Sequence, residues 1–198
     1  MKRIVLATKN KGKIKEMREL LAPMNIEVLS LADFSPVDDA EENGATFAEN
    51  AMLKARYYFA HTGTPCLADD SGLEVDALGG RPGVYSARYS GEDATDAANN
   101  AKVLREMEGI EKDKRTARFR CAMALVGEGI ELTTDGTCEG ALLTEERGQG
   151  GFGYDPIFYV PKFDRTLAEM SSEEKNSISH RGAAVRKMAD LIAEMMAK

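Results

Sequence analysis

The chain has 198 residues, of which 43% are apolar and 30% charged, and its formal net charge at pH 7 is −7. This length is enough for a full hydrophobic core and favours one domain over residues 1–198. The negative charge disfavours nonspecific nucleic-acid binding, and no apolar run approaches the roughly 18 residues of a membrane span. Because the apolar run at residues 4–7 is too short for a signal peptide, we expect a cytoplasmic protein.

The three cysteines do not suggest a disulfide framework. Cys66, Cys121 and Cys138 are widely spaced, odd in number and surrounded by apolar or small residues. We interpret them as reduced packing residues. An anionic small molecule remains a possible ligand, because a few converging lysines create a local positive site even in an acidic protein.

The chain begins with a strand, a turn and a helix. Residues 3–8 predict a buried strand, and residues 12–21 predict a helix whose apolar side chains share one face. A second short strand is expected at 26–29. The polar and acidic stretch 30–44 that follows is typical of a loop.

A second helix is expected after this loop. Thr46 and Glu49 have the spacing of a capping box, and Lys54 lies on or beside the apolar face of the predicted helix. An apolar strand over 65–68 is expected next, and the residues 69–72 that follow it predict an acidic turn.

The second half of the chain adds a hairpin and two more helices. The predicted elements are a tight loop at 79–83, a helix from Asp93 or Thr95 to about 108, a strand at 118–126, one or two strands over 130–143, a glycine-rich loop at 148–153, a strand at 157–160 and a helix at 181–197. Helices between strands at both ends and a hairpin in the middle indicate an α/β fold with a mixed sheet.

Asp69 and Asp70 are the strongest indication of chemistry. Two adjacent carboxylates cost stability unless positive charge faces them, so the pair suggests a divalent cation, an activated water, or both. Magnesium prefers a few carboxylates with water and phosphate oxygens. One of Glu41, Glu42 and Glu49 joined to one aspartate would therefore suit a metal bound to a triphosphate. The alternatives are a capping turn for the aspartates and solvated positions for the glutamates.

The segment at 8–13 is a candidate anion site. It lies between the first strand and its helix, where free backbone N–H groups and the helix dipole favour an anion, and it contains three lysines. It is not a P-loop, because Ala7 and Ile14 stand where that motif requires Gly and Ser or Thr. A solvated basic turn is the alternative interpretation.

The glycine-rich loop at 148–153 is a candidate base-binding segment. It matches the dinucleotide pattern G-x-G-x-x-G, but a strand rather than a helix follows, so we reject a dinucleotide site. Four glycines around Phe152 suggest a backbone that approaches a flat ligand, with the ring available for stacking. An ordinary hairpin loop is the alternative.

Two histidines mark helix ends. His61 ends the second helix, where it suits the helix dipole. His180 and Arg181 begin the last helix, and Lys175 nearby would add a hydrogen-bond donor for phosphate or base oxygens. A surface position is the alternative for the His-Arg pair.

Six motifs occur in order along residues 4–182. They are Thr8, Asn10 and Lys13, then segments 41–54, 69–72, 79–89, 150–156 and 179–181. Together they resemble the inosine/xanthosine triphosphate pyrophosphatase family, whose members hydrolyse noncanonical purine nucleoside triphosphates.

The resemblance implies a homodimeric, Mg²⁺-dependent hydrolase with an elongated mixed sheet flanked by helices. Two lobes of a single domain would enclose a cleft. The expected reaction converts ITP, dITP or XTP to the nucleoside monophosphate and pyrophosphate, which cleans the nucleotide pool. The partners implied are the nucleotide and a second copy of the chain, with no nucleic acid and no membrane.

The resemblance also implies roles for individual residues. Asp70 would be the proton acceptor for water and, with Glu41, a metal ligand, and Ser71 would contact substrate. The triphosphate would bind Thr8, Lys9, Asn10, Lys11, Gly12 and Lys13, with Lys54 also on the phosphates. The base would be enclosed by Phe152, Gly153, Tyr154 and Asp155, and its edge would contact Lys175, His180 and Arg181.

Hydrogen-bond polarity suggests how the base is chosen. Hypoxanthine and xanthine present an acceptor oxygen at C6, where adenine presents a donor, and arginine only donates. Arg181 against that oxygen would reject ATP but not GTP. Two other functions fit the chain: a related pyrophosphatase for pyrimidine or modified nucleotides, and a nucleotide-binding regulator without turnover.

Overall fold

The first strand leads directly into the first helix. The computed structural model describes residues 1–197. β1 (Arg3–Leu6) is buried at its last three positions, and α1 (Lys11–Leu21) is capped by Asn10, whose side chain accepts a hydrogen bond from the backbone of Lys13. The first turn of α1 contains no acidic residue, although the positive end of a helix dipole normally favours one. This helix end suits an anionic ligand.

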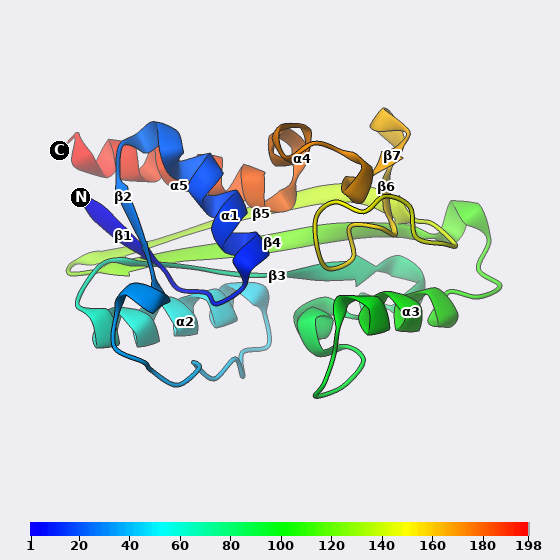
Figure 1. Ribbon diagram of the computed structural model, residues 1–198, viewed down its shortest axis with the longest axis horizontal. Helices are drawn as coiled ribbons and strands as arrows, with labels where there is room; N and C mark the ends of the chain where they lie inside the picture. The colour runs from blue at the N-terminus through cyan, green and yellow to red at the C-terminus, as the bar shows by residue number, and fades with distance from the viewer. Residues whose placement is uncertain (198) are drawn as a thin grey trace. The chain divides into compact units, whose positions relative to one another are not determined.

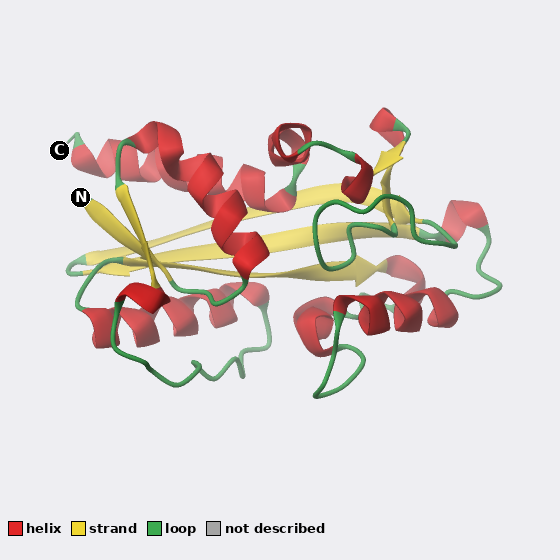
Figure 2. Cartoon of the chain, viewed as in Figure 1, coloured by secondary structure: helices red, strands yellow, loops and turns green. Residues whose placement is uncertain are grey.

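Within the described residues, seven strands form one mixed sheet in the order β2-β1-β3-β4-β5-β6-β7 (Figure 1, Figure 2). The remaining strands are β2 (Glu27–Ser30), β3 (Cys66–Val75), β4 (Thr116–Gly127), β5 (Ile130–Leu142), β6 (Phe158–Val160) and β7 (Arg165–Thr166). β1 is parallel to β2 and β3, whereas β6 is antiparallel to β5 and β7. The sheet confirms the predicted α/β class and its mixed character.

The chain divides into two compact units, the first made of Met1–Asp70, Cys121–Gly136 and His180–Lys198. In this unit α1 and α5 (His180–Met196) cover one face of the strands, and α2 (Phe47–Thr62) covers the other (Figure 1). The core under α1 and α5 includes Ile4, Leu6, Met17, Leu67, Met123, Val185 and Met188. On the other face, α2 buries Phe47, Ala51, Ala55 and Tyr58.

The second unit consists of Ser71–Arg120 and Thr137–Ser179 and has its own core. It contains α3 (Asp96–Glu106) and the short α4 (Ser172–Ile178). Its buried apolar side chains include Leu73, Val75, Val103, Met107, Phe119, Tyr154 and Phe158. The rings of Phe119 and Phe158 are in contact, with centroids 4.6 Å apart.

The predicted acidic turn after residue 68 is wrong. β3 continues through Asp69 and Asp70 to Val75. Ser71 and Gly72 resemble a turn locally, but Leu73 and Val75 beyond them are fully buried. Burying two alternate apolar side chains in the core of the second unit favours an extended chain over a turn.

The other predicted elements agree with the structure to within a few residues. Residues 130–142 form one strand rather than two, while β7 and α4 were not predicted because each is very short. The Thr46 side chain caps α2 by accepting the Glu49 backbone N–H. The Glu49 carboxylate, however, accepts from the backbone N–H of Ala45 at 2.7 Å, so the predicted capping box is only half formed.

All three cysteines are free and buried, which confirms their reading as reduced packing residues. Burial raises the pKa of the Cys66 and Cys138 thiols to about 11. His61 at the end of α2 lies with its Nε2 3.1 Å from the backbone oxygen of Ser35. None of the helices in the described residues is both long enough and apolar enough to cross a membrane.

The start of α5 is seated on β5 at Gly136. A Cβ atom at this position would lie 2.0 Å from the backbone oxygen of His180 and 2.8 Å from the backbone nitrogen of Ala184. We expect Gly136→Ala to lower the free energy of unfolding by about 3 kcal/mol, because backbone must move to admit the methyl group. Urea denaturation measures the loss. Thr133→Ala, at an exposed position of the same strand, is the control, and equal losses in the two variants would contradict the close approach.

Candidate active site

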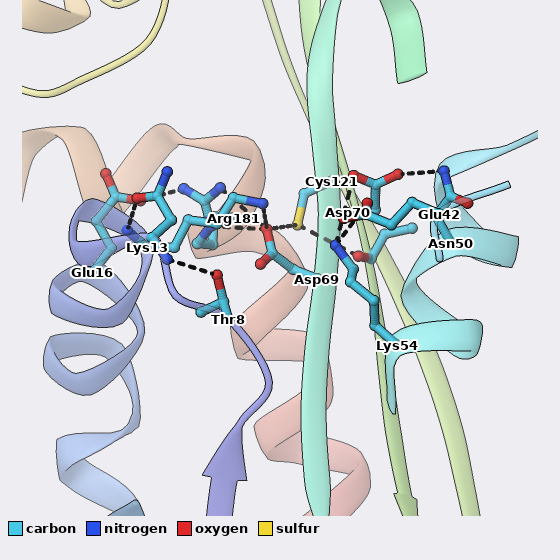
Figure 3. A network of polar contacts seen from close by, with 12 residues as sticks. Thr8, Lys13, Glu16, Glu42, Asn50, Lys54, Asp69, Asp70, Cys121 and Arg181 are labelled. Atoms are coloured by element: carbon cyan, nitrogen blue, oxygen red, sulfur yellow. Dashed lines mark hydrogen bonds and ion pairs between the residues drawn. The ribbon is translucent and has the colours of Figure 1, made fainter. Parts of the chain in front are cut away.

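Asp69 and Asp70 point to opposite faces of the sheet. They are neighbours on β3, and successive side chains of a strand alternate between its two faces. Figure 3 shows Asp69 directed toward Lys13 and Arg181, and Asp70 directed toward Asn50 and Lys54. The two carboxylates therefore occupy different environments.

Asp69 lies in a buried network of four charges. Its Oδ2 atom is 3.0 Å from Lys13 Nζ and 3.2 Å from Arg181 Nη2, and Arg181 Nε donates to the same oxygen at 3.3 Å. Arg181 Nη1 donates to Glu16 of α1. Two positive and two negative groups thus balance within the first unit, and Arg181 and Asp69 are almost completely buried.

This network keeps Asp69 ionised. Burial by itself would raise the pKa of the Asp69 carboxyl, but the positive charges of Lys13, Arg181 and Lys54 outweigh it and hold that pKa well below its usual range. Cys121 lies beside it, with Sγ 4.0 Å from Oδ2. Burial and the adjacent Asp69 carboxylate raise the pKa of the Cys121 thiol to about 12, so this cysteine stays protonated and unreactive.

Asp70 faces α2 and the loop before it. Its Oδ2 accepts a hydrogen bond from Asn50 Nδ2 at 3.0 Å, and its Oδ1 is 4.0 Å from Lys54 Nζ. Lys54 also forms a 3.0 Å ion pair with Glu42, and Asn50 Oδ1 accepts from the backbone N–H of Gly44 at 2.8 Å. Asn50 and Lys54 are four residues apart on α2 and therefore share the face that meets Asp70.

The pKa of Asp70 shifts opposite to that of Asp69. Burial raises the pKa of the Asp70 carboxyl by more than Lys54 and the Asn50 hydrogen bond lower it. Burial would also lower the pKa of Lys54, but Asp69, Asp70 and Glu42 raise it, so the ammonium group remains charged. Asp70 is consequently the stronger base of the two aspartates, which suits a proton acceptor.

The carboxylate near Asp70 belongs to Glu42 and not to Glu41. Lys54 lies between Glu42 and Asp70 and contacts both, whereas the side chain of Glu41 is exposed. Among the described residues, no three or more His, Cys, Asp and Glu side chains gather into a metal cluster. The oxygen donors of Asp70 and Glu42 nevertheless match the ligand preference of Mg²⁺, which takes few carboxylates and completes its shell with water and phosphate.

The three lysines of the segment at 8–13 lie in different environments. Thr8 Oγ1 accepts from the backbone N–H of Asn10 at 3.2 Å, and Asn10 caps the helix. Lys13 turns toward Asp69, while Lys9 forms a surface ion pair with Asp39 at 2.7 Å. Lys11 is exposed, and Gly12 lies in the first turn of α1. Of the three lysines, Lys13 is the one joined to the buried network.

The glycine-rich loop lies in the second unit, and an ion pair joins Asp155, two residues after the loop, to α4. Lys175 Nζ is 2.5 Å from Asp155 Oδ2, and both residues are buried. The same ammonium lies 4.7 Å from the centroid of the Phe152 ring. Asp155 Oδ2 also accepts from the backbone N–H of Phe152 at 3.0 Å. The structure therefore brings together Phe152, Asp155 and Lys175, to which the resemblance assigns contacts with the base, and that role stays a prediction.

Tyr154 is buried in the same unit, and its hydroxyl donates to the backbone oxygen of Ser86 at 2.7 Å. Ser71 follows Asp70 on β3 and is half-buried. His180 is buried at the start of α5 in the first unit, next to Arg181.

Glu16 and Asn50 contact the charged residues of the site, but no role was predicted for either of them from the sequence. Helical spacing is the signal that could have found them. Glu16 is three residues after Lys13 in α1, and Asn50 is four residues before Lys54 in α2, so each lies on the same helix face as a lysine that the sequence did predict.

Comparison with known proteins places the chain in a family. A family model described as the Ham1 family matches residues 4–191. The chain belongs to the Ham1 family. This membership confirms the resemblance drawn from the sequence motifs, since Ham1 relatives include proteins named dITP/XTP pyrophosphatase.

Ham1 relatives match the chain over nearly its full length. The dITP/XTP pyrophosphatase of Desulforamulus reducens is 53% identical over 191 residues, which cover 96% of this chain and 95% of the relative. That of Geobacillus kaustophilus is 52% identical over 197 residues, or 99% and 97% of the two chains. The structure of a HAM1 protein from Coxiella burnetii has 48% identity, covers 98% of this chain and 100% of its own, and gives a TM-score of 0.88.

In this Ham1 chain we expect Arg181→Ala to lower the free energy of unfolding by about 3 to 5 kcal/mol, because it removes the guanidinium charge that faces the buried Asp69 and Glu16 carboxylates. Adding Glu16→Gln to that variant removes one of the two negative charges and should restore part of the loss. Urea denaturation of both single variants and the double variant gives the coupling free energy.

Lys187→Ala is the matched control on the same helix. It removes an exposed ion pair with Asp135, which is worth at most about 1 kcal/mol. Arg181→Ala and Lys187→Ala variants of equal stability, or strictly additive effects of Arg181→Ala and Glu16→Gln, would contradict the buried network.

Proposed function

We propose that this chain hydrolyses noncanonical purine nucleoside triphosphates, namely dITP, ITP and XTP, to the monophosphate and pyrophosphate. Its relatives named dITP/XTP pyrophosphatase, matched at about full length, support the substrate class. The single structural observation that carries the chemistry is Asp70, a buried carboxylate with a raised pKa beside the Lys54 ammonium. The cellular role would be removal of these nucleotides from the pool.

Attack of water on the α-phosphorus needs an acceptor for the water proton and positive charge near the leaving pyrophosphate. Asp70 would accept the proton, and the Asn50 amide would fix the orientation of its carboxylate. Lys54 and Lys13 would bind phosphate oxygens, together with the backbone and side chains of residues 8–13. Asp69 would stay ionised and hold Lys13 in place.

Mg²⁺ is the proposed cofactor, held by Asp70 and Glu42. Their carboxylates flank Lys54 and supply the hard oxygen donors that this ion prefers. When bound, the ion would neutralise phosphate charge and lower the pKa of a coordinated water. The family resemblance implies Glu41 as a metal ligand, and this role remains a prediction. Mg²⁺ titration of Glu41→Gln and Glu42→Gln variants decides between the two glutamates.

The purine base is proposed to lie against residues 152–155 and Lys175. His180 and Arg181 as contacts of its edge remain sequence-based predictions. Three guanidinium nitrogens of Arg181 donate to Asp69 and Glu16, so a bond to the C6 oxygen would have to coexist with this network or replace part of it. The homodimer, the cytoplasmic location and the single catalytic domain of two lobes are further predictions of the resemblance.

We expect Asp70→Asn to lower kcat for ITP by at least about 100-fold, the range that a general base contributes, because the amide cannot accept the water proton. The fold should be retained, since an asparagine of the same size replaces the carboxylate. Pyrophosphate release measures the rate, and circular dichroism checks the fold. Asp135→Asn, at an exposed site, is the control, and a nearly active Asp70→Asn enzyme would refute the assignment.

The same assay separates the proposed function from its alternatives when it is run over a panel of nucleoside triphosphates with and without Mg²⁺. Turnover restricted to ITP, dITP and XTP supports the proposal. Faster turnover of pyrimidine or modified nucleotides would favour a related pyrophosphatase. Nucleotide binding without pyrophosphate release would favour a regulator.

Titration with Mg²⁺ tests the proposed ligands. We expect Glu42→Gln to raise the Mg²⁺ concentration needed for half-maximal activity by roughly tenfold, because it removes a charged oxygen donor. Glu41→Gln, one residue away and exposed, should leave that concentration nearly unchanged. The reverse order of effects would assign the ligand to Glu41.

A further inference from the structure

Two side chains of α3 hold the backbone of Gly153 in the glycine-rich loop. The backbone N–H of Gly153 donates to Asp96 Oδ2 at 2.7 Å, and its backbone oxygen accepts from Asn100 Nδ2 at 3.1 Å. Asp96 and Asn100 are four residues apart and therefore lie on the same face of α3. Both polar groups of one loop residue are thus fixed by one helix of the second unit.

The position of Gly153 in the loop gives these bonds their importance. Gly153 has φ of +62°, a conformation that favours glycine, and it separates Phe152 from Tyr154. On one side, the Phe152 backbone N–H donates to Asp155. On the other, the Tyr154 hydroxyl donates to Ser86. Displacing Gly153 would therefore turn the Phe152 ring away from its present orientation.

Asn100 is a polar residue of α3 whose side chain is almost completely buried. It is 2% exposed, and its Oδ1 has no hydrogen-bond partner within the described part of the chain. An unpaired buried acceptor costs stability, so a buried asparagine needs a reason. The bond from its Nδ2 to Gly153 supplies that reason, because no apolar side chain could make it.

Asn99 extends the same arrangement to a second segment of the chain. Its Oδ1 accepts from the backbone N–H of Ser90 at 2.7 Å, and its Nδ2 donates to the backbone oxygens of Ser86 and Ala87. The first turns of α3 therefore anchor the segment at 86–90, which begins in a 3-10 helix, and the loop at 148–153 at once. The bond between Tyr154, the residue after this loop, and Ser86 joins the two segments to each other.

We propose that Asp96 and Asn100 are positioning residues for the purine base, which they place by fixing Gly153 and hence Phe152 without touching the nucleotide. This inference rests on the proposed function, in which the base lies against residues 152–155. The triphosphate groups and the chemical step would not depend on these two side chains. Their loss should therefore weaken nucleotide binding and leave the rate of chemistry unchanged.

The test compares Asn100→Leu and Asp96→Ala with the intact chain. Each should raise KM for ITP about tenfold while kcat stays within about twofold. The inhibition constant of inorganic triphosphate, which has no base, should stay the same in both variants. Asn100→Leu also removes the unpaired acceptor, so its Tm should fall little or not at all, and a purely structural role would not produce a changed KM at an unchanged Tm.

Two controls use the same end of α3. Asp96→Asn retains an oxygen that accepts from Gly153 and should keep the KM of the intact chain. Thr95→Ala removes the N-cap, whose Oγ1 accepts from Ala98 at 3.1 Å, and should lower Tm without changing KM. A KM that follows Tm across all four variants would overturn the proposal, and so would an unchanged KM in both Asn100→Leu and Asp96→Ala.

Failure of the proposed function gives a different result. An intact chain that does not release pyrophosphate from ITP overturns the proposed function and this inference together. An intact chain that hydrolyses ITP, with variants of unchanged KM, overturns the positioning role alone.

Discussion

The alternation of side chains along β3 is the constraint on which the rest of the site depends. Because Asp69 and Asp70 are adjacent in a strand, they must face opposite sides of the sheet. One face receives α1 and α5 with Lys13 and Arg181, and the other receives α2 with Asn50 and Lys54. A turn at this position would have allowed both carboxylates to share one environment. The strand separates Asp69, whose carboxyl pKa is lowered by its positive neighbours, from Asp70, whose carboxyl pKa is raised by burial.

Charge balance then links the site to the packing of the first unit. Burying Asp69 is possible because Lys13 and Arg181 neutralise it, and burying Arg181 is possible because Glu16 supplies a second carboxylate. These residues come from three elements, so the network fixes α1 and α5 against β3 as well as fixing the aspartate. It also explains why the first turn of α1 contains Lys13 despite the unfavourable helix dipole: the lysine is matched by a carboxylate from another element.

The sequence predicted those features that have local causes. The Thr46 cap, the helix periodicities and the glycine-rich loop around Phe152 follow from residues close together in the chain. The extension of β3 through Asp69 depends instead on buried side chains further along and on pairing with distant strands. The bond between Arg181 and Glu16 joins residues far apart in the sequence. The ion pair of Lys54 with Glu42 rather than with the neighbouring Glu41 depends on a one-residue difference within a loop, which no periodic pattern specifies.

In both units, a helix asparagine holds a glycine of a loop that carries proposed binding residues. The side chain of Asn50 in α2 accepts from the backbone N–H of Gly44, two residues after Glu42. The side chain of Asn100 in α3 donates to the backbone oxygen of Gly153, the residue after Phe152. Such loops have no regular structure to fix their backbone, so a buried amide from a rigid helix supplies the order that ligand binding would otherwise have to impose. Within the described residues, Asn100 retains an amide oxygen without a hydrogen-bond donor while its Nδ2 makes this bond. A polar group kept at a cost to stability is expected where the geometry of a site, rather than packing, determines the residue.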